Sequence, residues 1–517
     1  MVAIVYSRTY ALNAAAFAGA LLSLLILTSI LRILRRRPKV SPLPPGPKGL
    51  PLLGNVHQLP AVYQERAFAK WGREFGAIVH AKLFRKNAII VNTAEVARDL
   101  MEKRSGNYSD RPEFILLNDL MGWENVVTQM RYGSRHRRHR KWIQDAFQGK
   151  ETLESYRYIQ LRERNIVLAG LLASPEAFVK HLTRFSAAMI MEITYGHRVV
   201  SDEDPFIAIT EEAGTATVRA GSPGSMLVDF FPILKYYPTW LPGSSWKTNA
   251  LNVRVLVQRV MDVPYNMVKN KMAAGNAWSS FTSSLLEECY RNGNISPQDE
   301  CDIKGAASVL YAAGTETTTT VLLTFLLAMV LHPDVFKKAQ AELDRASPFA
   351  DLLGSRKILI ENYRWHPPVP LAIPHGSMKD DEYRGFHIPG DSMVIPNIWG
   401  MCQDERNYPQ PDQFIPERFL NLKGGKDELL DPCNLIFGFG RRLCPGREFA
   451  DMNVFLVASS IISTMNVAKA LDETGQEITP LEDFTSGFVS RPKDFACRFV
   501  PRSKKVIHLI EQMNVSN

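Results

Sequence analysis

A cysteine stands among glycines and arginines late in the chain, in the run Phe437-Gly438-Phe439-Gly440-Arg441-Arg442-Leu443-Cys444-Pro445-Gly446. Glycines permit a tight loop, which can bring backbone N–H groups close to one sulfur atom. The apolar run after Ala450 predicts a helix that begins just beyond Cys444, and a helix N-terminus with nearby arginines stabilises a thiolate. A lone cysteine is more commonly a small buried apolar side chain. These residues alone leave a reactive thiolate and an inert thiol as alternatives.

A second chemical pattern is the polar stretch Gly314-Thr315-Glu316-Thr317-Thr318-Thr319-Thr320, which interrupts the apolar segment 302–331. If this segment is one helix, it is about 45 Å long at a rise of 1.5 Å per residue. A second membrane span is disfavoured, because a glutamate and five threonines interrupt it. Threonine and glycine weaken a helix. A functional site and a local packing adjustment are therefore equally good explanations.

Four short motifs, taken in their order along the chain, resemble the motifs of the cytochrome P450 family. The cysteine loop matches the family's haem-binding signature at Phe437, Gly440, Arg442, Cys444 and Gly446. The other three are Ala313-Gly314-Thr315-Glu316-Thr317, like the oxygen-activation stretch of the central helix, Glu361-Asn362-Tyr363-Arg364, like the Glu-x-x-Arg helix, and Phe414-Ile415-Pro416-Glu417-Arg418-Phe419, like the Pro-Glu-Arg-Phe element. A single match arises easily by chance, whereas four in the family's order do not.

This resemblance implies a haem-thiolate monooxygenase that inserts one atom of O2 into a hydrophobic small organic molecule. Cys444 would be the axial ligand to the iron of haem b, iron protoporphyrin IX, and Phe437 would belong to the same site. A thiolate ligand pushes electron density onto iron, which favours O–O cleavage. Two alternatives remain: a haem-thiolate isomerase or dehydratase that needs no reductase, and a haem-binding protein with impaired turnover. The amino-acid sequence as a whole resembles those of fungal enzymes of secondary metabolism and xenobiotic oxidation.

The resemblance assigns Thr317 and Glu316 to proton delivery. Breaking the O–O bond requires protons while bulk water is limited, and a hydroxyl that holds water beside a titratable carboxyl meets this need. The intact pair favours a monooxygenase over the isomerase alternative.

Haem propionates need fixed donors, and Arg140, Arg442 and His375 occupy the family positions that bind them; arginine suits bidentate contact. The family usually has tryptophan four residues before Arg140, where this chain has His136. Imidazole can still donate a hydrogen bond to a propionate. The alternative is that His136 belongs to a solvated basic face.

Glu361 and Arg364 sit three residues apart, so on one helix face they can form a charge-assisted pair. The resemblance implies that Arg418 completes this network, with a structural role. The alternative is that the two residues form a surface ion pair that contributes little to stability.

The sequence contains no evident flavin or nicotinamide fingerprint, so electrons must come from elsewhere. The resemblance implies a membrane-bound reductase that takes them from NADPH, with cytochrome b5 as a further candidate partner. The basic run 135–141, together with Lys337, Lys338 and Arg447, predicts a docking face, because complementary charge speeds encounter. No nucleic-acid module accompanies the run, so nucleic acid is not an expected partner.

Position in the family assigns the substrate pocket to four segments that are mostly apolar, which suits a hydrophobic or aromatic molecule. They are residues 114–127, 306–313, 368–373 and 484–489.

The N-terminus predicts a membrane anchor. No charged residue occurs between Ala11 and Leu31, and a helix of about 20 apolar residues crosses a bilayer. Arginines and a lysine follow, which keeps that side cytoplasmic. A cleaved secretory signal is disfavoured, because its charges normally come first. We therefore expect a single-pass endoplasmic reticulum protein whose catalytic domain is cytosolic.

The elements that position these residues are mainly helical, with small β sheets, and the resemblance implies the cytochrome P450 fold. Helical periodicity covers 151–195 and 302–331, short strands are expected at 76–80 and 88–91, and a loop-rich stretch runs from 366 to 446. The predicted organisation is a short N-terminus (1–10), an anchor (11–34), a basic and Pro-rich linker (35–51) and one catalytic domain (52–517).

Six scattered cysteines without a CxxC pair argue against a zinc site, and a chain this long needs no disulfide framework. The net charge of +8 suits an acidic partner or a membrane surface.

The connection between Leu343 and Glu361 is shorter than in related chains and contains Ser347-Pro348. A trimmed loop and a misassembled gene model are two explanations for it.

Overall fold

The computed structural model describes residues 41–221, 224, 226–345, 353–420 and 430–515. The predicted anchor at 11–34, the start of the linker and the Ser347-Pro348 break lie outside these residues. The chain divides into two compact units, one made of residues 1–44 and 380–388 and the other of 45–379 and 389–517.

The described part of the first unit is a hairpin with a short extended segment. Its strands are β4 (Asp381–Tyr383) and β5 (Phe386–Ile388), which pair antiparallel. Arg384 and Gly385 form the turn with φ angles of 53° and 79°, the left-handed values that two-residue hairpins favour. The backbone N–H of His387 donates to the carbonyl of Pro42 at 2.8 Å.

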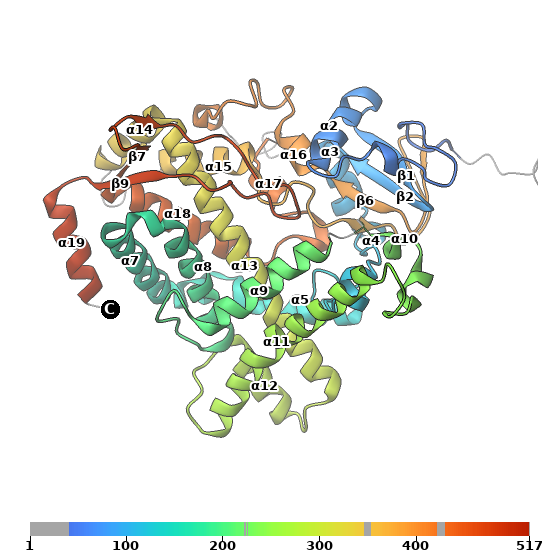
Figure 1. The fold of residues 1–517 in the computed structure, drawn as a ribbon, viewed down its shortest axis with the longest axis horizontal. Helices are drawn as coiled ribbons and strands as arrows, with labels where there is room; N and C mark the ends of the chain where they lie inside the picture. Colours follow the sequence, from blue (N-terminus) through green and yellow to red (C-terminus); the bar gives the residue numbers. More distant parts are fainter. Residues whose placement is uncertain (1–40, 222–223, 225, 346–352, 421–429, 516–517) are drawn as a thin grey trace, which may run out of the picture. The chain divides into compact units, whose positions relative to one another are not determined.

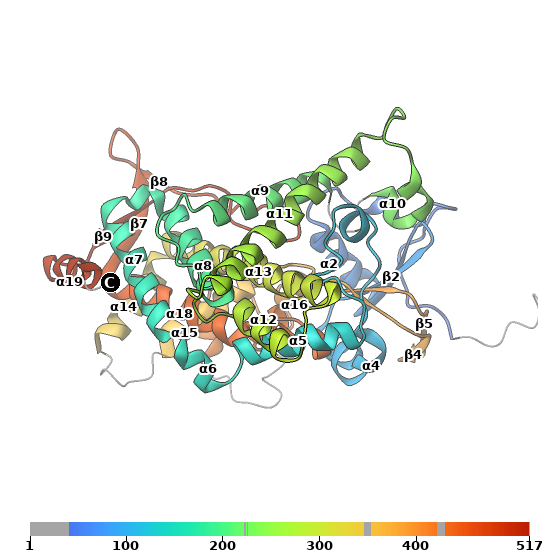
Figure 2. The same cartoon turned by 90° about the horizontal axis from the view of Figure 1, so that it is seen from below.

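Helices dominate the second unit, as the sequence predicted (Figure 1). Its α-helices are α2 (Gln64–Phe75), α3 (Ala94–Arg98), α4 (Ser105–Tyr108), α5 (Ser134–Phe147), α6 (Lys150–Ser155), α7 (Arg157–Ala173), α8 (Phe178–Tyr195), α9 (Pro205–Ala220), α10 (Leu227–Phe230), α11 (Ser245–Ala273), α12 (Phe281–Arg291), α13 (Pro297–Leu331), α14 (Pro333–Arg345), α15 (Leu353–Trp365), α16 (Ile398–Cys402), α17 (Cys433–Ile436), α18 (Arg447–Thr464) and α19 (Lys504–Val515). Its short irregular helices are η1 (Val56–Gln58), η2 (Asp99–Lys103), η3 (Leu116–Leu120), η4 (Pro175–Ala177), η5 (Pro232–Tyr236), η6 (Pro416–Phe419) and η8 (Gly440–Arg442). α9 and α11 lie side by side (Figures 1 and 2).

Two small sheets accompany the helices of this unit. The first has the order β1-β2-β6-β3, and the second has the order β8-β7-β9. Their strands are β1 (Ile78–Leu83), β2 (Lys86–Val91), β3 (His375–Gly376), β6 (Met393–Pro396), β7 (Met465–Leu471), β8 (Glu477–Ile478) and β9 (Cys497–Pro501). The β2–β6 pair is parallel, and the other pairs are antiparallel. The strand expected at 76–80 begins later, at Ile78, because pairing of β1 with β2 ends at Ile78 opposite Val91.

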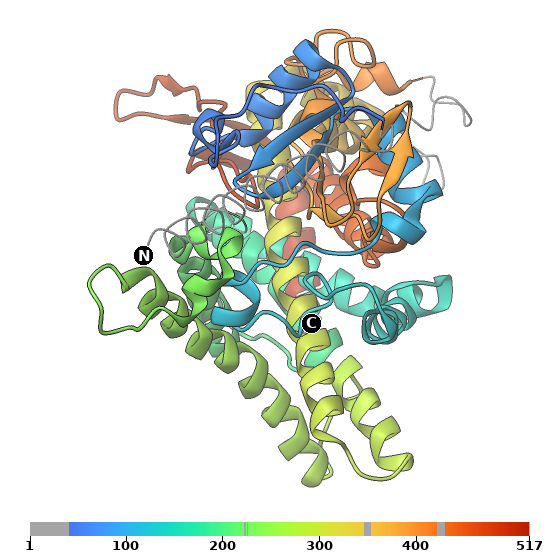
Figure 3. The ribbon, with the colours of Figure 1, turned by 90° about the vertical axis from the view of Figure 1, so that its right-hand side faces the viewer.

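The long helix α13 passes through the middle of the second unit, where it is the long yellow helix of Figure 3. It starts at Pro297 and not at the predicted Asp302, because Ser296 and Asp299 form a capping box that opens the helix earlier. It then continues unbroken through the polar stretch. Among the described residues it is the one helix long and apolar enough to span a membrane, yet 72% of its most apolar window is buried inside the protein. It is therefore a core helix.

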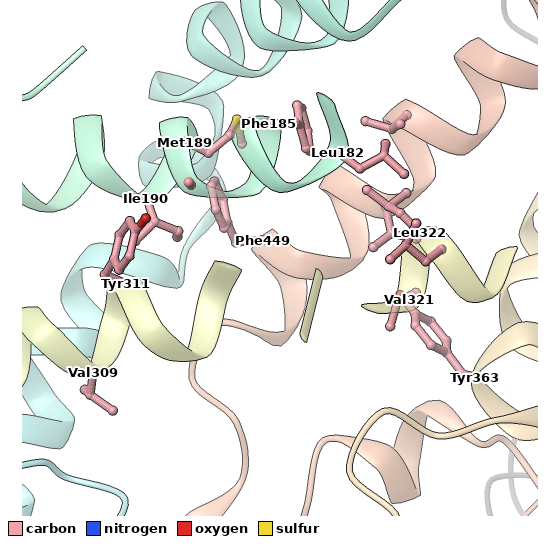
Figure 4. Close-up of a cluster of buried hydrophobic side chains, with 14 of the residues drawn as sticks. Leu182, Phe185, Met189, Ile190, Val309, Tyr311, Val321, Leu322, Tyr363 and Phe449 are labelled. Carbon is pink, nitrogen blue, oxygen red and sulfur yellow. The ribbon is translucent and has the colours of Figure 1, made fainter. Parts of the chain in front are cut away.

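The core around α13 is formed with α8, α15 and α18. Figure 4 shows apolar side chains of these helices facing one another, with Phe185 and Ile190 from α8, Leu322 from α13 and Phe449 from α18. Burying one such side chain contributes about 1.5–3 kcal/mol to the stability of the folded state. Gly314 allows close approach of α8, because a Cβ added there would lie 2.8 Å from Cγ1 of Ile190.

Candidate active site

Cys444 lies in a tight loop between η8 and α18, as predicted. Its backbone N–H donates to the carbonyl of Phe437 at 2.7 Å, and α18 begins three residues later at Arg447. Gly440 has a φ of 54°, and a Cβ there would lie 2.0 Å from the carbonyl oxygen of Met101. The glycine at 440 therefore lets the loop pack directly on backbone, which fixes where the cysteine points.

The thiol of Cys444 is half-buried in densely packed surroundings. Burial raises the pKa of this thiol, while the backbone N–H of Gly446, Arg140 and Arg447 act to lower it. These three groups would stabilise a thiolate at this position. A metal ion deprotonates a coordinating thiol outright.

A cluster of buried cations lies close to the cysteine. The guanidinium of Arg442 donates to the carbonyls of Ser109, Val127 and Met130 at 2.7, 3.1 and 2.7 Å. This side chain is only 9% exposed. Burial, together with the nearby charge of Arg140, lowers its pKa to about 10. Its bonds to backbone hold it in place without neutralising it.

Arg111 joins this cluster, although the sequence did not single it out. It is 5% exposed and donates to the carbonyls of Thr128, Ile373 and Pro374 at 2.9, 2.9 and 2.8 Å. Its neighbour Asp110 forms an ion pair with Arg131, with 2.6 Å between Oδ2 and Nη2. Nothing in its local sequence carries a chemical signature, so only packing reveals it.

The two predicted histidines belong to the same cluster. His375 is buried, and its Nδ1 lies 2.6 Å from the carbonyl oxygen of Tyr108. His136 is 2% exposed, so its interpretation as part of a solvated basic face is wrong. Burial, with the nearby charges of Arg442, Arg140 and Arg111, lowers the pKa of His136 to about 3.

This cluster has more positive than negative charge. The Nδ1 atom of His136 is buried without a hydrogen-bond partner, and Arg140 has no hydrogen bond or ion pair with any residue that the structure describes. Buried charges are normally paired. The arrangement of guanidiniums and a free imidazole nitrogen therefore suits a ligand with carboxylates.

The predicted relay residues lie where α13 exposes part of its surface. Ala313 and Glu316 are exposed and Thr317 is half-buried, although the helix is buried on either side of them. The hydroxyl of Thr317 donates to the carbonyl of Ala313 at 2.7 Å. Glu316 has no ion-pair partner among the described residues. A hydroxyl and a free carboxylate thus stand together at mid-helix, and α18 packs on the same helix.

The Glu361–Arg364 pair is confirmed as a buried network, and the surface-pair alternative is wrong. Both side chains are fully buried, and the guanidinium donates to the two carboxylate oxygens at 2.7 and 2.8 Å. Arg418 Nε donates to Glu361 at 3.2 Å, as does the backbone N–H of Ile415 at 2.8 Å. The rings of Tyr363 and Phe437 meet edge to face with 6.0 Å between their centroids, which connects α15 to the cysteine loop.

The basic run on α5 is not the uniformly free surface that the sequence suggested. Arg135 and Arg138 are ion-paired with Asp302, and His139 is fully buried. Lys338 is paired with Glu417 at 2.9 Å. Arg137 and Lys141 are exposed and contribute to a free basic surface.

Comparison with known proteins decides what this site belongs to. The family model described as cytochrome P450 matches residues 44–499. The chain belongs to the cytochrome P450 family. This P450 is 43% identical over 493 residues to "Cytochrome P450 monooxygenase 136" of Postia placenta, covering 93% of this chain and 92% of the relative. It is 41% identical to "Cytochrome P450 monooxygenase 176" of the same fungus, with 96% of each chain covered.

A third relative is "Tryptamine 4-monooxygenase" of Psilocybe cyanescens, 35% identical, with 94% of this chain and 98% of the relative covered. The relatives are oxidoreductases that incorporate oxygen, and this P450 is an enzyme of that class. The family implies a haem cofactor. The residues present fit that group, because Cys444 offers a sulfur held by the Gly446 N–H and the cation cluster offers partners for two carboxylates.

Proposed function

We propose that this P450 inserts one oxygen atom from O2 into a hydrophobic small organic molecule, using electrons from NADPH through a reductase. The observation that carries the proposal is the thiol of Cys444 near Arg140, which has no hydrogen bond or ion pair among the described residues, in a loop that also holds the buried Arg442. The likeness to fungal monooxygenases supports a role in fungal secondary metabolism or xenobiotic oxidation.

Haem b would be held by Cys444 at its iron and by the cluster at its propionates, with Arg140, Arg442, Arg111, His136 and His375 as the donors. When bound, the haem supplies oxygen activation, which a thiolate ligand promotes. The chain's own contribution is to fix these donors. Backbone carbonyls lock Arg442 and Arg111, so little side-chain freedom is lost when the propionates bind.

Thr317 and Glu316 would hold and deliver protons on the α13 side. The hydroxyl of Thr317 donates to the Ala313 carbonyl, which leaves its oxygen lone pairs free to accept from a water molecule. Glu316 is exposed beside it and can exchange protons with that water. This pair favours a monooxygenase over the alternative of a reductase-independent isomerase, which needs no proton delivery.

Thr317→Ala is expected to uncouple electron use from oxygen insertion. Losing the hydroxyl removes the group that holds the water, and positioned proton transfer contributes a factor of about 10²–10⁴. The fraction of consumed NADPH recovered as hydrogen peroxide should rise severalfold with an apolar substrate present. Thr317→Ser keeps the hydroxyl and is the matched control. Wild-type coupling in Thr317→Ala would exclude Thr317 from the relay.

The substrate is proposed to be apolar because the segments assigned to the pocket are apolar. Phe114, Leu116 and Leu120 are buried in the first of these segments, and Ala306 and Ala307 are buried in the second. The relative from Psilocybe cyanescens is named for the oxidation of tryptamine. We extend only its general class, a small hydrophobic or aromatic molecule.

The reductase, with cytochrome b5 as a further donor, would dock on the exposed cations of α5. Arg137 and Lys141 are four residues apart on that helix and exposed. A membrane-bound reductase also agrees with the predicted anchor at 11–34. Arg135 and Arg138 are left out of the docking face because they are ion-paired internally.

Reversing both exposed charges, with Arg137→Glu and Lys141→Glu, should slow reduction by the reductase roughly tenfold at low salt, since charge steering changes association rates on that scale. The rate is followed by stopped flow under carbon monoxide. Lys70→Glu reverses an exposed charge on α2 and serves as the control. An unchanged rate and salt dependence in the double variant would place the docking face elsewhere.

A further inference from the structure

Asp302 joins two helices that carry different parts of the proposed site. It lies in the second turn of α13, and its side chain is fully buried. Arg135 Nε donates to one carboxylate oxygen at 2.5 Å and Arg138 Nη2 donates to the other. Gln298 adds a bond of 2.9 Å. Two arginines of α5 are therefore fixed on a single carboxylate of α13.

The same arginines make further bonds that prevent α5 from turning. Arg135 Nη2 donates to Asn125 at 2.6 Å, and Arg138 Nη1 donates to Asp299 at 2.9 Å. His139 Nε2 lies 3.2 Å from Asp302, without hydrogen-bond geometry. Burial and the two arginines hold the pKa of His139 at about 3, so its ring is neutral and the arginines pair with the carboxylate.

The geometry of an α-helix transmits this clamp to the haem donors. Residues 135, 138 and 139 share the face that meets Asp302, because positions three and four apart lie together. His136 and Arg140 are each one residue further on, about 100° around the helix axis. His136 Nδ1 and Arg140 have no partner of their own among the described residues. Their direction is thus set by the rotation of α5.

We propose that Asp302 is a positioning residue for haem retention, which holds α5 so that Arg140 and His136 face the propionates. This inference rests on the proposed haem site. Asp302 is fully buried, and removing one partner from a buried ion-pair network is costly.

The test is the rate at which the purified holoenzyme loses haem to excess apomyoglobin, followed by absorbance. Asp302→Asn keeps the shape but loses the charge, and should speed haem loss about ten- to hundredfold, the range seen when outer partners of a metal site are removed. In an Arg140→Ala/His136→Ala background the same change should alter the rate less than about twofold, because the contacts that the clamp positions are already lost. Glu300→Gln is the matched control, since Glu300 lies on the same helix and forms its ion pair with Lys304.

Wild-type haem loss in Asp302→Asn, or an equal acceleration with and without the Arg140 and His136 side chains, would overturn the proposal. If Asp302→Asn does not fold, Arg135→Gln loosens the clamp while Arg138 keeps its bond to Asp302, and the same two criteria apply to it. If the wild-type protein takes up no haem at all, the proposed function itself fails. That outcome is distinct from failure of the clamp.

Discussion

Cys444→Ser is expected to abolish reductase-supported turnover and the spectrum of a thiolate-ligated haem. Serine fits the loop and keeps the backbone bond from residue 444 to the Phe437 carbonyl, so the fold should survive. A neutral hydroxyl cannot replace the electron donation of a thiolate. Substrate oxidation should therefore fall to background, measured as NADPH-dependent product formation with a reductase.

The control for this variant is Cys301→Ser, which changes an exposed cysteine on α13. It should keep full activity and an unchanged spectrum. Cys402 and Cys497 are buried, and burial raises the pKa of each thiol to about 12. Neither suits a thiolate. Residual thiolate spectra in Cys444→Ser would mean that another cysteine is the ligand.

Glu361→Ala should have the largest effect on stability. The change leaves Arg364 fully buried and Arg418 nearly so, without their shared carboxylate. Breaking a buried ion pair by removing one partner costs about 3–5 kcal/mol, against a total stability of about 5–15 kcal/mol. We expect a large fall in the urea midpoint of unfolding and poor haem incorporation.

Asp391→Asn is the matched control, because it breaks an exposed ion pair with Lys86, of 2.7 Å. Asp391 has a φ of 55°, which asparagine tolerates. Loss of the ion pair with Lys86 should lower the free energy of unfolding by less than about 1 kcal/mol. If Glu361→Ala is no worse than Asp391→Asn, the buried network does not stabilise the fold.

Features encoded within a few residues could be predicted from the sequence. The loop glycines predicted the tight turn at Cys444, and the apolar run after Ala450 predicted the helix beyond it. The three-residue spacing of Glu361 and Arg364 predicted their pairing. The predicted start of α13 at Asp302 is wrong, because the capping box of Ser296 and Asp299 opens the helix at Pro297. That signal is local and could have been found.

Features that depend on distant partners could not be predicted. The run 135–141 looks like a basic surface until Asp302, more than 160 residues away, pairs with two of its arginines. Arg111 gives no sequence signal because its partners are backbone carbonyls. The burial of His136 likewise follows from how α5 packs, and the spacing of charged residues along the sequence does not predict that packing.

The most direct test of haem–thiolate ligation is the absorbance spectrum of the reduced wild-type protein with carbon monoxide. The protein is expressed with haem supplied, purified, reduced with dithionite and exposed to the gas. Ligation by Cys444 predicts a strongly red-shifted Soret band that is absent in Cys444→Ser. A band typical of histidine- or water-ligated haem, or a protein that binds no haem, would contradict it.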